Sequence, residues 1–180
     1  MTEHEREGVL VRLIQELRAK GSWCGETHIQ KASFFLQAMC RVPTGFDFIL
    51  YKHGPYSFDL TEKLTALRAE GLLELEPRAY PYGPSICPAE ASKRLLDTEA
   101  SAIERHARAI RFVGDALGQM SVADLERLAT ALYVTQKLGV ATDASVRSAE
   151  ISSLKPHIPV EQAKEAVSQV DELRGEYART

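Results

Sequence analysis

Apolar residues recur every three or four positions over most of this chain, which is the pattern of amphipathic α-helices. In residues 7–20 the apolar positions share one helical face. A second helical pattern begins near Thr27, which we expect to act as its N-cap, and ends at residues 41–45. A third follows Ser57, whose hydroxyl is also suited to cap a helix, and ends near Gly71.

Three shorter stretches have the composition of strands. Residues 46–51 are rich in aromatic and β-branched side chains and predict a strand over 46–52 that Gly54-Pro55 ends. Residues 72–76 alternate between apolar and acidic side chains, and residues 85–87 are suited to return beside them as a β-hairpin. The order of three helices and a hairpin is that of a winged helix, here with an inserted strand.

Beyond the hairpin the pattern is helical to the last residues. We expect a helix over about 90–117 with a break near Asp97, and further helices after Ser121 and Asp143, which are N-cap residue types. Pro159 suits the first position of the last helix, because its missing N–H is not needed there.

The fold class predicted is therefore α+β and mostly α, with a winged-helix-like core over residues 1–90. An α-helical extension over residues 91–180 would pack on that core, and the two parts would form one compact unit. The last helix carries an apolar line made by Ala163, Val167 and Val170. This line predicts either ordinary core or the contact of a homodimer.

Charge and cysteine usage narrow the class of protein. Lys and Arg number 22 against 25 Asp and Glu, a net charge of -3, whereas nucleic-acid binders are usually basic. The first residues are polar and acidic, unlike a signal peptide, and no apolar run reaches the roughly 20 residues that span a bilayer. Three widely spaced cysteines suit a reducing compartment. We expect a cytoplasmic protein without membrane contact.

Residue spacing indicates neither an enzyme nor a cofactor site. The cysteines form no C-x-x-C pair, the histidines lack metal-ligand spacing, and no glycine-rich phosphate loop occurs. Cys24 and His28 are close in sequence, but a half-buried cysteine at the start of a helix is the simpler interpretation. We predict no catalytic residue, no metal and no cofactor.

Two segments remain as candidates for binding a partner protein. The first is the turn at residues 53–57, and the second is the tyrosine-rich tip of the hairpin at residues 78–84. Tyrosine is enriched at protein interfaces because its ring offers a large contact area with a polar end. The predicted contact residues are His53, Gly54, Pro55, Tyr56, Ser57, Arg78, Tyr80 and Tyr82. The alternative for residues 53–57 is a structural turn satisfied by backbone hydrogen bonds.

A DNA-binding winged helix is the second hypothesis. Its third helix would enter the major groove, so that helix should present basic or amide side chains. Here the polar positions of the third helix carry three acids and two bases, which is a poor surface for phosphates. If nucleic acid were bound, the contacts would come from Lys63, Arg68 and Arg78.

Four segments together resemble a known bacterial family. They are residues 25–36 (GETHIQKASFFL), 46–51 (FDFILY), 52–57 (KHGPYS) and 154–159 (LKPHIP). In this arrangement the chain resembles the YwgA-like proteins and, more distantly, the SocA-like proteins of the Panacea domain, which share an "xHGP" turn after a "KLQKLLY" helix. The helix here reads Ile29-Gln30-Lys31-Ala32 instead, and the long helical C-terminal part is not general among Panacea domains.

The resemblance implies a class of function and no catalytic residues. Panacea domains are found as antitoxins that neutralise a toxin by direct contact and as an adaptor that delivers a toxin to a protease. By this resemblance the chain would be a non-enzymatic protein that binds a partner protein, such as an antitoxin, a proteolysis adaptor or an accessory subunit of a bacterial defence system.

Overall fold

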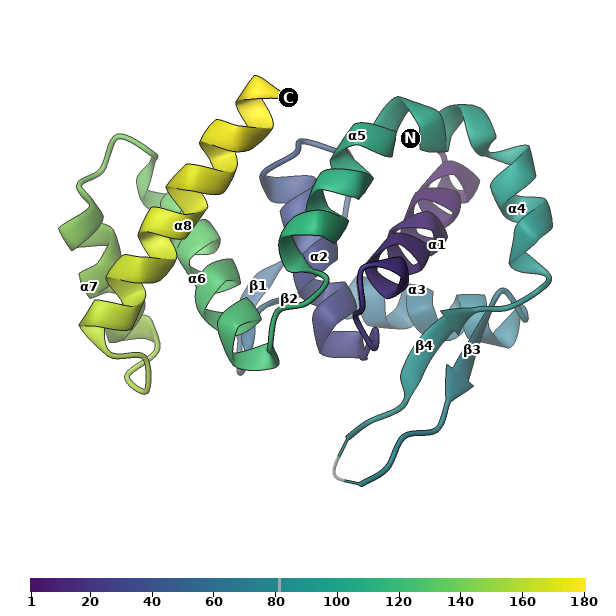
Figure 1. Cartoon of the computed structure of the whole chain (residues 1–180), viewed down its shortest axis with the longest axis horizontal. Coiled ribbons are helices and arrows are strands. Elements are labelled where there is room, and N and C mark those ends of the chain that lie inside the picture. The colour runs from purple at the N-terminus through teal and green to yellow at the C-terminus, as the bar shows by residue number, and fades with distance from the viewer. Residues whose placement is uncertain (81) are drawn as a thin grey trace.

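The computed structural model describes residues 1–80 and 82–180, and that part of the chain contains eight helices and two antiparallel hairpins (Figure 1). In chain order the elements are α1 (Glu3–Ala19), α2 (Glu26–Ala38), β1 (Ile49–Tyr51), β2 (Gly54–Tyr56), α3 (Phe58–Ala69), β3 (Leu73–Glu76), β4 (Ser85–Pro88), α4 (Ser92–Thr98), α5 (Ala100–Leu117), α6 (Val122–Leu138), α7 (Ala144–Leu154) and α8 (Val160–Arg179). The prediction of an α+β, mostly α protein is confirmed.

The prediction of a single inserted strand over residues 46–52 is wrong. The structure has a hairpin in its place, because the chain reverses at Lys52-His53 and Gly54-Pro55 begins β2 instead of ending β1. Residues 46–48 are not a strand, because the side chain of Gln37 binds the Phe46 backbone. Its Nε2 donates to the Phe46 carbonyl at 2.8 Å, and its Oε1 accepts from the Phe46 N–H at 3.0 Å.

Helix starts follow the predicted caps in three cases. The side chains of Ser57, Ser121 and Asp143 accept hydrogen bonds from the first turns of α3, α6 and α7. Thr27 is not an N-cap, because the chain turns at Cys24, with φ of 50°, and α2 begins after Gly25. Pro159 lies one position earlier than predicted, as the N-cap of α8.

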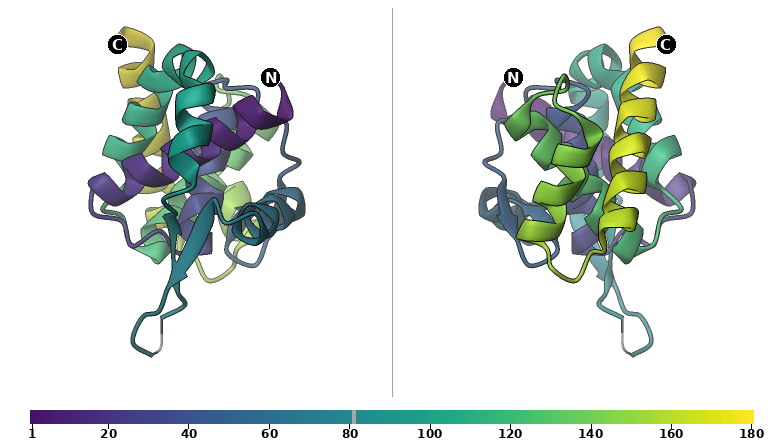
Figure 2. Two further views of the ribbon diagram at one scale, coloured as in Figure 1. Left: turned by 90° about the vertical axis from the view of Figure 1, so that its right-hand side faces the viewer. Right: turned by 90° about the vertical axis from the view of Figure 1, so that its left-hand side faces the viewer.

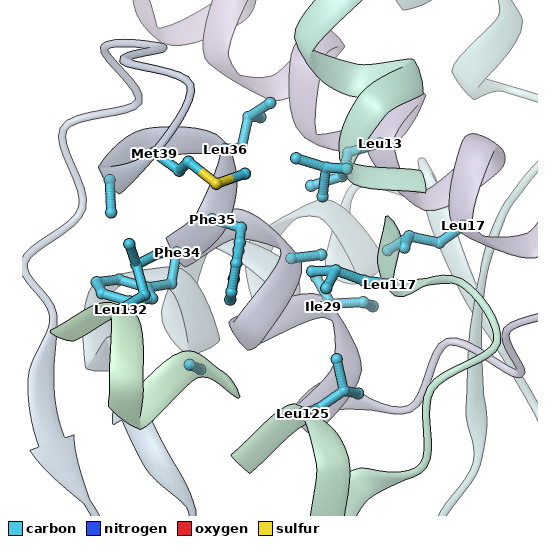
Figure 3. Close-up of a cluster of buried hydrophobic side chains, with 14 of the residues drawn as sticks. Leu13, Leu17, Ile29, Phe34, Phe35, Leu36, Met39, Leu117, Leu125 and Leu132 are labelled. Atoms are coloured by element: carbon cyan, nitrogen blue, oxygen red, sulfur yellow. The ribbon is translucent and has the colours of Figure 1, made fainter. Parts of the chain in front are cut away.

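The core joins both halves of the chain. Figure 3 shows Leu13 and Leu17 of α1 and Phe35 of α2 meeting Leu117 of α5 and Leu125 of α6, and all five side chains are fully buried. These residues belong to one hydrophobic cluster that contains members from residues 1–90 and from residues 91–180. Burial of each such side chain stabilises the fold by about 1.5–3 kcal/mol.

Helix α8 completes the helical side of the molecule. It lies across α6 and α7 (Figures 1 and 2), and Ala163, Val167 and Val170 are fully buried there. The homodimer contact predicted for these three residues is therefore wrong, and the alternative of ordinary core is correct. The β3–β4 hairpin extends away from the helices in every view (Figure 2). Across the described residues, no helix combines the length and apolar character that a bilayer crossing requires.

Candidate functional site

The hairpin formed by β1 and β2 packs tightly on α6 through Gly54. The backbone of Gly54 has φ of 86°, which disfavours other residues. A Cβ atom at this position would lie 3.2 Å from Oγ1 of Thr130 and 3.4 Å from the carbonyl oxygen of Glu126. Glycine therefore provides both the turn and the close approach to α6.

Two adjacent residues of α2 hold the chain that follows Gly54. Gln30 donates from Nε2 to the carbonyl of Ser57 at 2.8 Å, and its Oε1 accepts from the Ser57 N–H at 2.9 Å. Lys31 donates from Nζ to the carbonyl of Pro55 at 2.9 Å. Both side chains are almost completely buried, and burial lowers the pKa of Lys31 to about 8. The α2 segment and the turn are thus joined by buried hydrogen bonds.

The segment between α7 and α8 holds the same hairpin from the other side. Lys155 donates from Nζ to the carbonyl of Tyr51 at 2.6 Å and also to the carbonyl of Lys52. The same ammonium lies 3.4 Å from Oε1 of Glu126, a residue that is 9% exposed. Residues 154–159 and residues 52–57, about one hundred positions apart in sequence, therefore meet at one carboxylate.

Two exposed imidazoles flank that carboxylate. Nε2 of His157 lies 3.2 Å from Oε1 of Glu126, and Nδ1 of His53 lies 3.6 Å from Oε2. Within residues 1–80 and 82–180, no three His, Cys, Asp or Glu residues are placed to hold a metal ion. Glu126, Lys155 and Lys31 contact other groups of the protein, so the cluster positions the hairpin.

The hairpin held in this way presents apolar side chains to solvent. The rings of Tyr51, Tyr56 and Phe58 contact one another, with centroid separations of 5.1 to 5.8 Å. Tyr51 is 49% exposed, Phe58 52% and Ile49 49%. We call Ile49, Tyr51, Tyr56 and Phe58 the aromatic patch. The hydroxyl of Tyr56 bonds to Oγ1 of Thr61 at 2.6 Å, which fixes the orientation of its ring.

The β3–β4 hairpin forms a second surface of aromatic character. The ring of Tyr82 lies 5.2 Å from Trp23, and the guanidinium of Arg78 lies 5.5 Å from the same indole ring. Tyr80 is 97% exposed. A groove of about 410 Å³ runs between this hairpin and the start of α2. Its lining includes Trp23, Tyr82, Leu75, Arg68 and Glu26.

Glu26 connects the two surfaces. Its side chain lines the groove, and its Oε1 accepts from the Tyr56 hydroxyl at 3.2 Å and from Oγ1 of Thr61 at 2.6 Å. The predicted turn and the predicted hairpin tip are therefore neighbours through this carboxylate. Pro81, which belongs to the predicted tip, lies outside the described residues.

The predicted contact residues divide into two groups. His53, Tyr56, Arg78, Tyr80 and Tyr82 have solvent-accessible side chains. Gly54, Pro55 and Ser57 are buried, so their assignment to a contact surface is wrong: they shape the hairpin and cap α3.

Sequence reasoning missed the exposed side chains on either side of the turn, namely Ile49, Tyr51 and Phe58. Tyr51 and Phe58 bracket residues 52–57, and that flanking position was a usable signal. The contact of Glu126 with Lys155 and His157 had no signal in the local sequence.

The residues proposed for nucleic-acid contact have other partners or surroundings. Nζ of Lys63 pairs with Glu3 at 2.6 Å and with Glu7 at 2.9 Å, so its charge is neutralised within the chain. Arg78 lies over an indole ring and Arg68 lines the groove. The thiol of Cys24 points to the carbonyl of Ile14, and the ring of His28 bonds to the hydroxyl of Ser22, which also accepts from the Cys24 N–H.

Neither models of known protein families nor curated proteins match this chain. The class of molecule that the structure defines is a mostly helical α+β protein. It carries an exposed aromatic hairpin held in place by buried polar side chains.

Proposed function

We propose that this protein is a non-enzymatic cytoplasmic module that binds a partner protein. An antitoxin, a proteolysis adaptor or an accessory subunit of a defence system are the roles that the resemblance implies. The observation that carries the proposal is the aromatic patch, in which two rings and an isoleucine are each about half exposed. Contiguous exposed apolar groups of this kind are typical of interaction sites.

The rigidity of the patch supports binding. Gln30, Lys31 and Lys155 fix the backbone on which Tyr51 and Tyr56 stand, and Phe58 begins α3 directly after the Ser57 cap. A surface that is already ordered loses little conformational entropy when a partner binds. Aromatic side chains in such positions are frequent hot spots of interfaces.

The groove beside the β3–β4 hairpin extends the same surface. Trp23 and Tyr82 provide apolar walls, and Glu26 lies between the groove and the patch. A partner segment that covers the patch therefore has a concave site next to it for an apolar side chain. Single Tyr56→Ala and Tyr82→Ala variants test the two ends of this surface separately.

The proposal is tested by affinity capture of the tagged full-length chain from its native host, with half of each sample treated with nuclease. The patch variant is Tyr51→Ser with Phe58→Ser. The matched control is Val146→Ser with Val160→Ser, which changes two exposed apolar residues on α7 and α8, with exposed fractions of 52% and 44%.

We expect a nuclease-resistant protein partner whose recovery falls at least about tenfold in the patch variant, since each hot-spot side chain contributes about 2 kcal/mol or more. The control should retain the partner. Equal recovery of every partner by the wild type and the patch variant would refute the assignment of this surface.

DNA binding is the second candidate, because the order of α1, α2, α3 and the β3–β4 hairpin is that of a winged helix. It predicts nucleic acid in the untreated half of the capture and a salt-sensitive complex that Arg68→Glu and Arg78→Glu abolish. The engagement of Lys63 by Glu3 and Glu7 and the acidic residues of α3 argue against it.

A further inference from the structure

The chemistry of the partner can be inferred from the charges around the aromatic patch. We infer that the patch binds a segment of the partner protein that carries Arg or Lys side chains among apolar residues. This inference rests on the proposed function, since it names the kind of partner that the same surface would take.

Four exposed acidic residues contact the patch or lie within a few positions of its residues in sequence: Glu26, Asp47, Asp59 and Glu62. In the part of the chain that the structure describes, none of the four forms an ion pair. Many other carboxylates of the protein do, including Glu3 and Glu7 with Lys63. The negative charge beside the patch is therefore available to a partner.

The positions of these acids follow from the elements that carry them. Exposure alternates along residues 47–51, so Asp47 lies on the same side of the chain as Ile49 and Tyr51. Glu62 is four residues after Phe58 on α3, which places it on the same face of that helix one turn further on. The resulting surface is apolar at its centre and negative at its border.

Cations bind favourably to such a surface in two ways. They pair with carboxylates at its border, and they lie over the faces of aromatic rings. The second interaction already occurs within the described part of the protein: Arg108 lies 4.5 Å from the ring of Tyr177, Arg78 5.5 Å from Trp23 and Arg6 5.6 Å from Phe46. On the patch, Tyr51 and Phe58 are half exposed and accessible to a cation of the partner.

Most of the positive charge near the patch is engaged within the protein. Lys31 and Lys155 are buried behind the hairpin, where they bind its carbonyls close to Glu126, and Arg68 lines the groove that Glu26 also lines. Lys52 is exposed in the hairpin turn, whereas Lys63 is engaged by two carboxylates of α1. His53 faces Glu126. An acidic segment or a nucleic acid would meet repulsion from the four border carboxylates, and a basic apolar segment would meet attraction.

The test uses a random-peptide library displayed on phage and selected on the immobilised full-length chain. The library is first depleted on the Tyr51→Ser, Phe58→Ser variant, so the enriched peptides are those that need the patch. We expect Arg and Lys to be enriched about twofold or more over the unselected library, next to apolar residues.

The affinity of the most enriched peptide, made synthetically, is then measured by fluorescence anisotropy. Asp47→Lys with Glu62→Lys should weaken binding roughly tenfold, because each reversal replaces an attraction with a repulsion. The matched control is Glu104→Lys with Glu165→Lys, which makes the same change of net charge at exposed acids of α5 and α8. It should change the affinity by less than about twofold.

Two results would overturn the inference. Patch-dependent peptides that are neutral or acidic would exclude a basic partner segment and leave the proposed function standing, because the patch would still bind protein. A selection that yields no patch-dependent peptide would also exclude it, and the capture experiment would then decide the proposed function independently.

Discussion

The buried lysine of α2 should give the free energy of unfolding an unusual pH dependence. Lys31 is 1% exposed, and its ammonium donates one hydrogen bond, to the carbonyl of Pro55. Burial lowers the pKa of Lys31 from 10.5 to about 8, because the charged form is poorly solvated. The Lys31→Met variant keeps the length of the side chain and removes the charge.

The size of this effect on the free energy of unfolding follows from the pKa of Lys31. The difference between 10.5 and about 8 corresponds to roughly 3 kcal/mol of destabilisation of the charged folded state, at about 1.4 kcal/mol per pKa unit. Lys31→Met removes this penalty, but it leaves the buried Pro55 carbonyl without a donor, which costs about 1–3 kcal/mol. Near pH 7 the two effects nearly cancel, and the variant should be within about 2 kcal/mol of the wild type.

The sign of the pH dependence is set by proton binding. Between about pH 8 and pH 10.5 the unfolded chain binds a proton at Lys31 that the folded chain has lost, so this residue makes stability rise with pH. Below about pH 8 both states are protonated and the penalty is complete. From about pH 7 to about pH 10, the wild type should therefore gain roughly 2–3 kcal/mol relative to Lys31→Met.

Urea unfolding of both proteins across this range measures the effect. The difference between them must be used, because burial raises the pKa of Cys24 to about 11 and of Cys40 to about 12. These thiols hold protons that the unfolded chain loses, so they lower the stability of both proteins equally as the pH rises. A difference in unfolding free energy that stays constant from about pH 7 to about pH 10 would refute the desolvation of Lys31.

Three further substitutions test the frame of the hairpin by urea unfolding. Gly54→Ala should destabilise by roughly 1–3 kcal/mol, because of its positive φ and the contact with Thr130, whereas Gly83→Ala, which faces open space, should stay within about 0.5 kcal/mol. Gln30→Leu should cost about 1–3 kcal/mol, since the buried Ser57 N–H loses its acceptor, while the Ser57 carbonyl keeps the Thr61 N–H as a donor at 3.3 Å. Thr130→Val should be neutral or stabilise by up to about 1 kcal/mol, because Oγ1 of Thr130 is buried and has no hydrogen-bond partner among the described residues; clear destabilisation would contradict this.

The helices were predictable because their signals are local. A hydroxyl or carboxylate at an N-cap and an apolar period of 3.6 act within a few residues, so Ser57, Ser121 and Asp143 were identified correctly. The first hairpin was not predicted in the same way. Its first strand is short because the side chain of Gln37 forms hydrogen bonds with the backbone of Phe46. This contact joins residues nine positions apart, and the pattern of apolar residues does not reveal it.

The candidate site was predictable only in part, for the same reason. The turn at residues 53–57 stood out by composition, but composition does not separate residues that shape a turn from those that a turn exposes. Pro55 is buried and its carbonyl accepts from Lys31, whereas Tyr51, on the neighbouring strand of the same hairpin, is exposed. The role of Glu126 depends on the packing of α6 against β2, which only the tertiary structure contains.

The use of polar side chains to hold this hairpin has a physical reason. A hairpin of two three-residue strands leaves backbone carbonyls without ladder partners, and buried carbonyls require donors. Lys31 and Lys155 have the reach to supply them from α2 and from the α7–α8 connection, and Gln30 supplies both a donor and an acceptor. Because these bonds are directional, they set the orientation of the strands more closely than apolar packing alone. Gln30→Leu and Gly54→Ala should therefore lower the stability and, by displacing the patch, also weaken the binding of a partner. Substitutions of Tyr51 and Phe58 should weaken that binding alone.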